Sequence, residues 1–351
     1  MIRFIHCADL HLGIKKYGKI NPKTGINTRI EEDLKQFDKI VNFAIKKECN
    51  YFFIAGDIFD KRKPEDIVKR EFAKRLKKLK RKKIVTVIVI GNHEGVTATD
   101  TAHCLSSEKV LSSSRYLYIV DDNKVVETDD LNIICMPYYD RHINFLERVK
   151  YPSIVIGHLE MYGAKQGEYT FKNENSVNPK IFNNKNIVYV ALGHIHNRQK
   201  VGKAIYSGSI NRINFGDEHS IKGFIYGNMK GKKCIWKFIQ LKSRRFKTIR
   251  DIWSKKLIEN IKEELLENTI IKVIVFVDAG EVVPIYDIKK AIINKGGVID
   301  SVVINSNIKK KIRDKKYAKR RKPEEFLRHY LLGKKERTIK RGLKILEKVK
   351  V

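Results

Sequence analysis

Five turns along the chain carry Asp, Asn or His directly after a short apolar segment. They are Asp9-Leu-His11, Gly56-Asp57-Ile-Phe-Asp60, Gly91-Asn92-His93-Glu94, Gly157-His158 and Gly193-His194-Ile-His196. Carboxylate, amide and imidazole ligands together suit divalent manganese, iron, magnesium or zinc. No cysteine lies in these turns, which disfavours a structural zinc site. The residue types therefore predict a catalytic metal centre.

Seven side chains in these turns are candidate ligands: Asp9, His11, Asp57, Asn92, His158, His194 and His196. They suffice for two cations if one carboxylate bridges, and Asp57 is the natural bridge because the others divide evenly around it. Two cations roughly 3.5–4 Å apart can bind a phosphate, activate a water and neutralise the charge that grows on phosphorus. His93 is placed to act as the protonated group near the leaving oxygen. The pattern predicts phosphoester hydrolysis.

Each turn taken alone has an ordinary structural explanation. Asp is common in turns, a histidine after a strand is more often structural, and one His-x-His can arise by chance. A shared site is favoured because five of the ten histidines fall in these turns, each behind its own apolar segment. We interpret the other five as structural: His6, His103, His142, His219 and His329.

The segments that must position these turns alternate as in a layered α/β protein. Strands are expected at residues 3–8, 51–55, 84–90, 133–136, 154–156 and 188–192. Val68, Phe72, Leu76 and Leu79 form the apolar face of a helix that begins near Pro64. Because ligands gather beyond the carboxyl ends of strands in such folds, the five turns are expected to converge.

The net charge of +33 favours a polyanionic partner, with nucleic acid the first candidate. Biased codon usage and binding to a membrane surface are the alternatives, and ten basic residues within 69–83 fit either a DNA contact or a solvated surface. The five cysteines are odd in number and scattered, which predicts a reducing, cytoplasmic environment without disulfides. No apolar segment is long enough to span a bilayer, and no long basic amphipathic helix with aromatic anchors stands out, so a membrane is not the expected partner.

The second part of the chain has its own organisation. Residues 242–250 resemble a linker; helices are expected at 254–267 and 284–294, and strands at 270–277 and 298–304. Ten of the fourteen residues 309–322 are basic, and two short helices are expected at 323–332 and 336–349. We therefore divide the chain into a catalytic domain (1–240), a small α+β domain (241–307), a basic linker (308–322) and a helical tail (323–351). The tail has too little core to be stable alone, so it either packs on the rest of the chain or binds a helix of a partner protein.

The order D-x-H, G-D-x-x-D, G-N-H-[D/E], G-H, G-H-x-H resembles the calcineurin-like metallophosphoesterase superfamily. The resemblance implies an α/β fold whose core is a two-sheet β-sandwich with mixed sheets, flanked by helices. It also divides the ligands. One metal would be held by Asp9, His11, Asp57 and His196, and the other by Asp57, Asn92, His158 and His194. His93 would be the catalytic histidine, paired with Asp60.

Within this superfamily the chain resembles the SbcD and Mre-eleven nucleases. Residues 8–13 (ADLHLG), 56–60 (GDIFD) with Pro64, and 206–209 (YSGS) carry the match. The second domain would then be a DNA-capping domain, and residues 323–331 (PEEFLRHYL) resemble the tail that binds the coiled-coil root of the partner ATPase, SbcC or Rad-fifty. Archaeal relatives often have His where Asp60 stands, which places the role of Asp60 in question.

The function implied is a manganese-dependent nuclease of double-strand-break repair. It would bind two Mn2+ per chain, act as a homodimer with the ATPase, and combine 3′-to-5′ exonuclease on duplex ends with single-strand endonuclease activity; Mg2+, Fe2+ and Zn2+ remain alternatives. A phosphatase or small-molecule phosphodiesterase of the same superfamily is the main rival. However, phosphoprotein phosphatases carry G-D-x-V-D-R-G, and Lys61-Arg62-Lys63 stands here instead. A third interpretation is a DNA-binding scaffold whose metal site has decayed. Decay normally removes ligands, and none of the seven is missing here, which argues against this interpretation.

Overall fold

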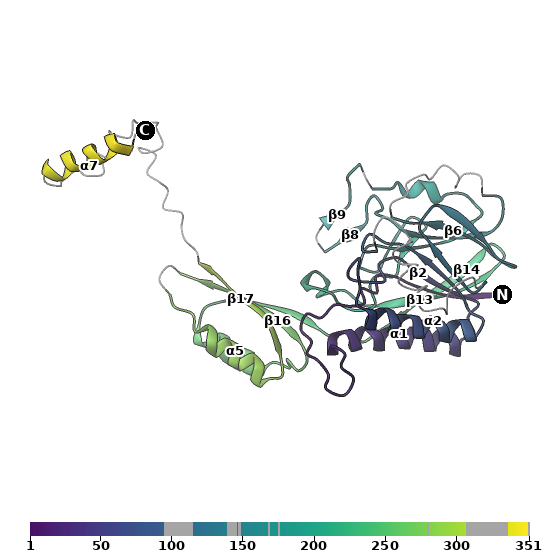
Figure 1. The fold of residues 1–351 in the computed structure, drawn as a ribbon, viewed down its shortest axis with the longest axis horizontal. Coiled ribbons are helices and arrows are strands. Elements are labelled where there is room, and N and C mark those ends of the chain that lie inside the picture. The colour runs from purple at the N-terminus through teal and green to yellow at the C-terminus, as the bar shows by residue number, and fades with distance from the viewer. Residues whose placement is uncertain are drawn as a thin grey trace.

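The computed structural model describes residues 1–94, 115–138, 146, 149–167, 169–174, 176–278, 281–306 and 336–349. Up to β14 the chain builds two six-stranded sheets that face each other, with helices α1 and α2 beneath them in the view of Figure 1. Both sheets contain parallel and antiparallel pairs, so the expected mixed β-sandwich flanked by helices is confirmed.

The first sheet has the order β14-β13-β1-β2-β3-β4. Strands β1, β2, β3 and β4 run parallel, and the hairpin β13–β14 pairs antiparallel with β1 through β13. The strands expected at residues 3–8, 51–55 and 84–90 are present as β1, β2 and β3, each within two residues of its predicted ends. The bounds are Ile2–Cys7 (β1), Tyr51–Ala55 (β2), Val85–Val89 (β3), Leu117–Val120 (β4), Gly223–Lys230 (β13) and Lys233–Gln240 (β14).

The second sheet has the order β11-β12-β10-β7-β6-β5. Strands β6, β7, β10 and β12 are parallel, and the outer strands β5 and β11 are antiparallel to their neighbours. The bounds are Lys124–Glu127 (β5), Asn132–Met136 (β6), Ser153–His158 (β7), Ile187–Gly193 (β10), Gln199–Val201 (β11) and Ala204–Tyr206 (β12). A short ribbon, Lys165–Gln166 (β8) with Tyr169–Thr170 (β9), and the 3-10 helix Pro179–Phe182 (η2) lie between β7 and β10.

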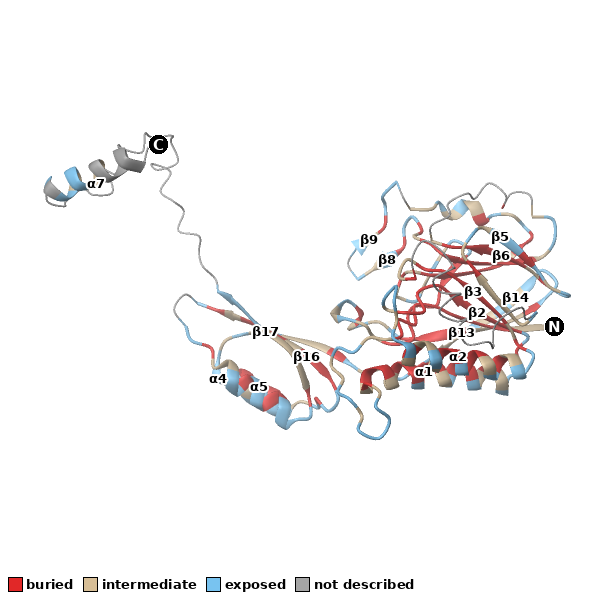
Figure 2. Cartoon of the chain, viewed as in Figure 1, coloured by how far each residue is buried: buried red, intermediate tan, exposed pale blue. Residues whose placement is uncertain are grey.

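Apolar side chains fill the space between the sheets. In Figure 2 the strands of both sheets contain long stretches of buried residues, drawn in red. Phe4 and Phe53 from the first sheet meet Tyr189 from the second, and Phe4 and Tyr189 have ring centroids 4.9 Å apart. Strand β2 is buried on both faces, and all five of its residues are buried. This double burial explains why the strand is a continuous apolar segment in the sequence.

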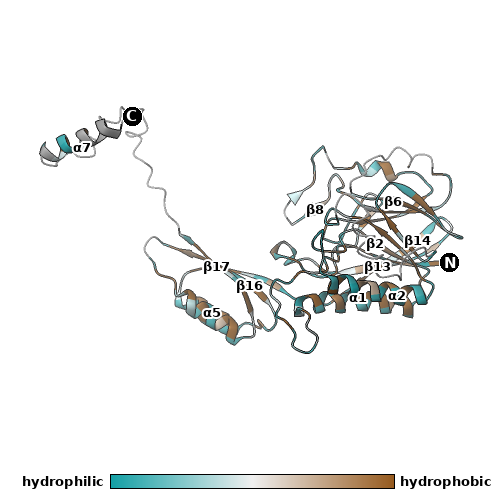
Figure 3. Cartoon of the chain, viewed as in Figure 1, coloured by the Kyte–Doolittle hydropathy of each residue, from teal (hydrophilic) through white to brown (hydrophobic). Residues whose placement is uncertain are grey.

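Helices α1 (Thr28–Lys46) and α2 (Asp66–Arg81) cover the outer face of the first sheet. Their apolar faces pack on the sheet, and Figure 3 shows hydrophobic (brown) and hydrophilic (teal) residues alternating along both helices. Helix α2 begins one residue after Glu65, close to the start predicted from Pro64. Phe72 of α2 stacks on Phe37 of α1, so the predicted apolar stripe is the packed one.

A separate unit follows, made of β15 (Phe246–Ile252), α4 (Lys255–Glu263), β16 (Ile270–Val277), α5 (Ile285–Asn294) and β17 (Val298–Ser306). Its three strands are parallel in the order β15-β16-β17, and it has its own apolar cluster. The interpretation of residues 242–250 as a linker is wrong from Phe246 onward, because β15 pairs there with β16. Polar and charged residues separate Phe246, Ile249 and Ile252 in this edge strand, so it lacks the apolar segment or strict alternation that would predict a strand.

Polar contacts join this unit to the sandwich. Lys16 Nζ and Tyr17 Oη both donate to Asp300 Oδ1, at 2.7 and 2.5 Å. Thr248 donates from its main-chain N and its Oγ1 to the carboxylate of Glu218, at 2.9 and 2.6 Å. The loop that follows the first motif is thus tied to the last strand of the C-terminal unit.

Helix α7 (Glu336–Val349) has the bounds expected from the sequence, whereas the basic linker and the helix expected at 323–332 lie outside the described residues. Within the described ranges, none of the helices combines the length and apolarity that a bilayer crossing requires.

His6 is fully buried at the interface of the two sheets and is the neutral tautomer that carries its hydrogen on Nε2. Nε2 lies 3.1 Å from the carbonyl oxygen of Leu192, which only accepts, so Nδ1 accepts from Tyr189 Oη at 3.0 Å. Burial lowers the pKa of His6 from 6.5 to about 3, opposed in part by the Leu192 contact. The structural interpretation of this histidine agrees with its surroundings.

We therefore expect His6 to make stability depend on pH. The unfolded state takes up a proton below pH 6.5 and the folded state only near 3, so the stability contribution is complete above 6.5 and is lost as pH falls between these values. Urea unfolding of the metal-free protein at pH 4 to 8 should show a slope of up to about 1.4 kcal/mol per pH unit from this group. His6→Gln should lack that part of the slope; an unchanged slope would contradict the assignment.

Candidate metal centre

The five polar turns lie where five strands end. Asp9, Asp57 and Asn92 follow the carboxyl ends of β1, β2 and β3, which are parallel neighbours in the first sheet. His158 is the last residue of β7 and His194 follows β10, which are parallel neighbours in the second sheet. The sandwich therefore brings all seven predicted ligands to one rim, as expected from the direction of the strands.

One group of ligand atoms gathers around Asp57 Oδ2. His11 Nε2 lies 3.5 Å from this oxygen and 3.2 Å from His196 Nε2. Asp9 Oδ1 accepts from the main-chain N of His194 at 2.9 Å, and Asp9, Asp57 and His158 offer ligand atoms within 4.8 Å of one another. Two imidazole nitrogens and one oxygen of Asp57 are therefore available to one cation, with the Asp9 carboxylate close to both groups.

A second group gathers around the other oxygen, Asp57 Oδ1. His158 Nε2 lies 3.4 Å from Asp57 Oδ1 and 3.1 Å from Asn92 Oδ1. His194 Nδ1 lies 3.0 Å from the same Asn92 oxygen. The two carboxylate oxygens of Asp57 thus face two different sets of ligands, which is the arrangement a bridging carboxylate needs.

The donor set fits divalent cations. Asp9 Oδ2 is buried and makes no hydrogen bond within the described residues, and burial, together with Asp57, raises the pKa of Asp9. Burial also lowers the pKa of both His11 and His194 to about 3, so both rings keep a free lone pair at neutral pH. Burial opposes the charged form of His158, but Asp57 outweighs it and raises its pKa to about 9. A cation would stabilise the crowded carboxylates and take the place of this proton.

The backbone at the ligands is strained. Asp9, His11, Asp57 and His194 have φ values of 51°, 43°, 49° and 92°, which is the left-handed region that side chains with a Cβ rarely adopt. Each such residue costs on the order of 1–3 kcal/mol and persists only where surrounding contacts impose it. Hydrogen bonds between the turns impose it here: Asp9 N donates to Gly56 O at 3.1 Å and His11 N to Asp57 O at 3.0 Å.

Glu94 holds two of the turns together, a role that its place in the third motif did not reveal. Its buried carboxylate accepts from the main-chain N of Asp57 (3.1 Å), Phe59 (2.9 Å) and Gly91 (2.9 Å). A Cβ at Gly91 would lie 2.2 Å from Asp57 Oδ1, so glycine is required for this close approach. Burial, reinforced by Asp57, raises the pKa of Glu94 to about 7.

His93 differs from the other site histidines in its exposure. Its side chain is 36% exposed, whereas those of His11, His158, His194 and His196 are between 0% and 15% exposed. Its main-chain N donates to Asp57 Oδ1 at 3.0 Å, and its Nε2 lies 4.0 Å from Asp57 Oδ2. The ring therefore stands at the edge of the ligand cluster, where it can reach a substrate.

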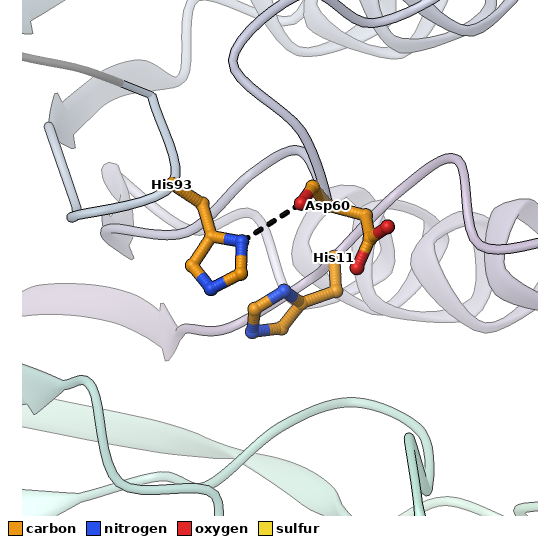
Figure 4. Close-up of side chains that lie close together, drawn as sticks. All are labelled: His11, Asp60 and His93. Atoms are coloured by element: carbon orange, nitrogen blue, oxygen red, sulfur yellow. Dashed lines mark hydrogen bonds between the residues drawn. The ribbon is translucent and has the colours of Figure 1, made fainter. Parts of the chain in front are cut away.

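The predicted pairing of His93 with Asp60 takes place through the main chain. His93 Nδ1 lies 2.8 Å from the carbonyl oxygen of Asp60, which is the dashed line in Figure 4. A carboxylate oxygen of Asp60 also lies within 4.8 Å of ring nitrogens of His11 and His93. Because a carbonyl oxygen is present whatever the side chain, a different residue at position 60 can keep the contact.

Two carboxylates close to His194 and His196 belong to none of the sequence motifs and were not predicted. Glu160 Oε1 lies 3.4 Å from His194 Nε2, and Asp217 Oδ2 lies 3.7 Å from His196 Nδ1. Both come from connecting segments after the motifs, so no local spacing in the sequence indicates them.

Residues 2–198 match the model of the calcineurin-like phosphoesterase family, which is more than half of the chain. The chain therefore belongs to this family, whose members are metal-dependent hydrolases of phosphoesters.

Among curated proteins, the chain is similar to the DNA double-strand break repair protein Mre11 of two archaea. It is 25% identical to the protein of Sulfolobus acidocaldarius, in a match that covers 57% of this chain and 50% of the relative. It is 26% identical to the protein of Methanocaldococcus jannaschii, in a match that covers 59% of this chain and 56% of the relative. The chain thus spans about half the length of the curated relatives it matches. A dimetal phosphatase of Danio rerio is a structural neighbour with 11% identity, a TM-score of 0.42, and coverage of 67% of this chain and 98% of the neighbour.

Proposed function

We propose that this chain is a manganese-dependent DNA nuclease that cuts duplex ends from 3′ to 5′ and cuts single strands internally, as part of double-strand-break repair. The observation that carries the proposal is the position of Asp57, whose two oxygens face separate sets of ligands at one rim of the sandwich. The similarity to Mre11 relatives and the net charge of +33 support DNA as the substrate.

The residues divide the work as follows. Asp9, His11, Asp57 and His196 would hold one cation, and Asp57, Asn92, His158 and His194 the other. Bound divalent cations would supply positive charge that stabilises the phosphoryl oxygens and activates the attacking water. In its protonated form, His93 donates from Nδ1 to the Asp60 carbonyl and has a second hydrogen on Nε2, which it can transfer to the leaving oxygen. Glu94 keeps the Asp57 turn in place throughout.

A basic cavity beside the site supports a polyanionic substrate. The cavity has a volume of about 370 Å3 and extends from Leu12 and Asp60 toward four lysines. Lys15 is paired with Glu65 and Lys16 with Asp300, while Lys61 and Lys63 are exposed. A phosphate backbone that enters the ligand cluster would pass these two ammonium groups.

We expect Lys61→Gln/Lys63→Gln to weaken DNA binding and to reduce its salt dependence. Each lost phosphate contact should lower the slope of log K against log salt concentration by about 0.9 for duplex DNA. Fluorescence anisotropy between 50 and 300 mM salt measures the slope. Lys82→Gln/Lys83→Gln is the matched control, since these exposed lysines precede β3 at the opposite end of the strand from Asn92. Equal slopes for both double variants would exclude a specific role of the cavity.

The nuclease assignment is tested with end-labelled duplex and circular single-stranded DNA in manganese, alongside a chromogenic phosphate monoester and a bis-ester. We expect cleavage of both DNAs, and Asp57→Ala controls for contaminating nucleases. Strong hydrolysis of the monoester with intact DNA would favour the phosphatase alternative. Absence of manganese binding by calorimetry would favour a scaffold.

The partners belong to the same proposal. The chain would act as a homodimer with an ATPase of the SbcC or Rad-fifty type, bound through residues 323–351, and the unit of residues 246–306 would cap the DNA. Helix α7 supplies part of this tail, with Glu336 and Lys340 forming a salt bridge of 3.7 Å one turn apart.

Removal of residues 323–351 is expected to leave manganese-dependent cutting unchanged and to abolish association with the ATPase. The reason is that all seven ligands and His93 lie before residue 200, in a part of the chain with its own core. Co-purification with the ATPase coiled coil and cleavage of single-stranded DNA give the two readouts. Unchanged co-purification would refute the assignment of the tail.

A further inference from the structure

A buried ion pair lies directly behind His196. Lys222 Nζ is enclosed by Asp217 Oδ1 at 2.7 Å, Ser209 Oγ at 2.8 Å and the carbonyl oxygen of His196 at 3.0 Å. The side chain of Lys222 is 0% exposed and that of Asp217 is 4% exposed. An ammonium group has three hydrogens, and each has an acceptor here, which makes burial of the charge tolerable.

The carboxylate of Asp217 is held in place by hydrogen bonds that do not involve His196. Oδ1 accepts from Lys222, and Oδ2 accepts from the main-chain N of Ile213 at 2.9 Å. The same Oδ2 lies 3.7 Å from His196 Nδ1, a buried atom that makes no hydrogen bond within the described residues. A fixed negative charge therefore stands next to the nitrogen of His196 that does not face the ligand cluster.

The two ring nitrogens of His196 therefore have different surroundings and different roles. Nε2 faces His11 Nε2 at 3.2 Å, so it is the nitrogen available to a cation. The hydrogen of the ring must then be on Nδ1, where a carboxylate favours it and increases the basicity of Nε2. Lys222 also fixes the main-chain carbonyl of the same histidine, so the pair restrains both the ring and its backbone.

We propose that Asp217 and Lys222 are positioning residues that set the orientation and tautomer of His196 for metal binding. Their place in the fold supports this: Asp217 ends the 3-10 helix Phe215–Asp217 (η3), and Lys222 immediately precedes β13. A Cβ at Gly208 would lie 2.6 Å from the carbonyl oxygen of His196, so the YSGS turn packs closely over the same point. The inference rests on the proposed metal site but not on DNA as the substrate.

Titration of the metal-free full chain with manganese chloride by calorimetry tests the proposal. Asp217→Asn should weaken binding at one of the two sites by about 10- to 100-fold, the range typical for loss of such an outer carboxylate. Glu218→Gln is the matched control, because the neighbouring carboxylate binds Thr248 rather than a metal ligand, and its manganese affinity should equal that of the wild type. In cleavage assays at fixed manganese, kcat of Asp217→Asn should fall while KM for DNA stays unchanged.

The double variant Asp217→Asn/Lys222→Met separates positioning from stability. Removing both charges should recover thermal stability lost in Asp217→Asn, since no uncompensated ammonium remains buried. The manganese affinity should stay low, because the carboxylate behind His196 is still missing. Wild-type affinity in Asp217→Asn, or affinity restored together with stability in the double variant, would overturn the proposal. A wild type that binds no manganese would overturn it and the proposed function; one that binds manganese but leaves DNA intact would overturn the nuclease alone.

Discussion

Asp57→Asn is expected to abolish measurable binding of both Mn2+ ions and to reduce DNA cleavage by at least roughly 10³-fold, equivalent to about 4 kcal/mol of lost transition-state stabilisation. Asp57 Oδ2 faces His11 Nε2 at 3.5 Å and Asp57 Oδ1 faces His158 Nε2 at 3.4 Å. An amide presents only one oxygen and no net charge, so it cannot serve both sets. Calorimetric titration of the metal-free protein and cleavage of end-labelled DNA are the measurements.

A variant of one outer ligand gives the comparison. His11→Gln removes a ligand from the Asp57 Oδ2 side only, so it should lose one binding event and retain the other. Circular dichroism and thermal unfolding should verify that both variants are folded before affinity is interpreted. If Asp57→Asn bound two Mn2+ with wild-type affinity, the bridging assignment would be wrong.

His93→Ala is expected to reduce the rate of cleavage by about 10²- to 10⁴-fold, the usual contribution of general acid–base catalysis, with manganese affinity within a fewfold of the wild type. The ring is the most exposed of the five site histidines, and its Nε2 lies 4.0 Å from Asp57 Oδ2, at the edge of the ligand cluster rather than within it. Single-turnover cleavage at saturating manganese and DNA isolates this step from binding.

Asp60→Asn is the matched variant for His93. The contact between the two residues runs from His93 Nδ1 to the main-chain carbonyl of Asp60, which the substitution leaves in place. We expect a much smaller effect than for His93→Ala. A loss as large as that of His93→Ala would mean that the Asp60 carboxylate itself takes part, whereas a large loss of manganese affinity in His93→Ala would make His93 a ligand instead.

The strands and ligand-bearing turns of the sandwich were largely predictable from the sequence. Segments such as residues 51–55 and 188–192 are apolar because both faces are buried, so burial is visible in composition alone. Some edge strands were not visible: β15 (FKTIRDI) places Lys, Arg, Thr and Asp between its apolar residues, and it pairs with β16, which lies further along the chain. Strand pairing depends on residues distant in the chain, which no local pattern contains.

The candidate site divides in the same way. Local patterns are enough to show which residue types gather, since Asp57, Asn92 and His194 each come directly after an apolar strand segment, and the carboxyl ends of such strands lie at one rim. How these side chains are held depends on the folded protein. Glu94 binds three main-chain amides, Asp217 stands behind His196, and four ligands adopt left-handed φ values. These features arise from hydrogen bonds between separate turns, and they exist only once both sheets have brought those turns within reach of each other.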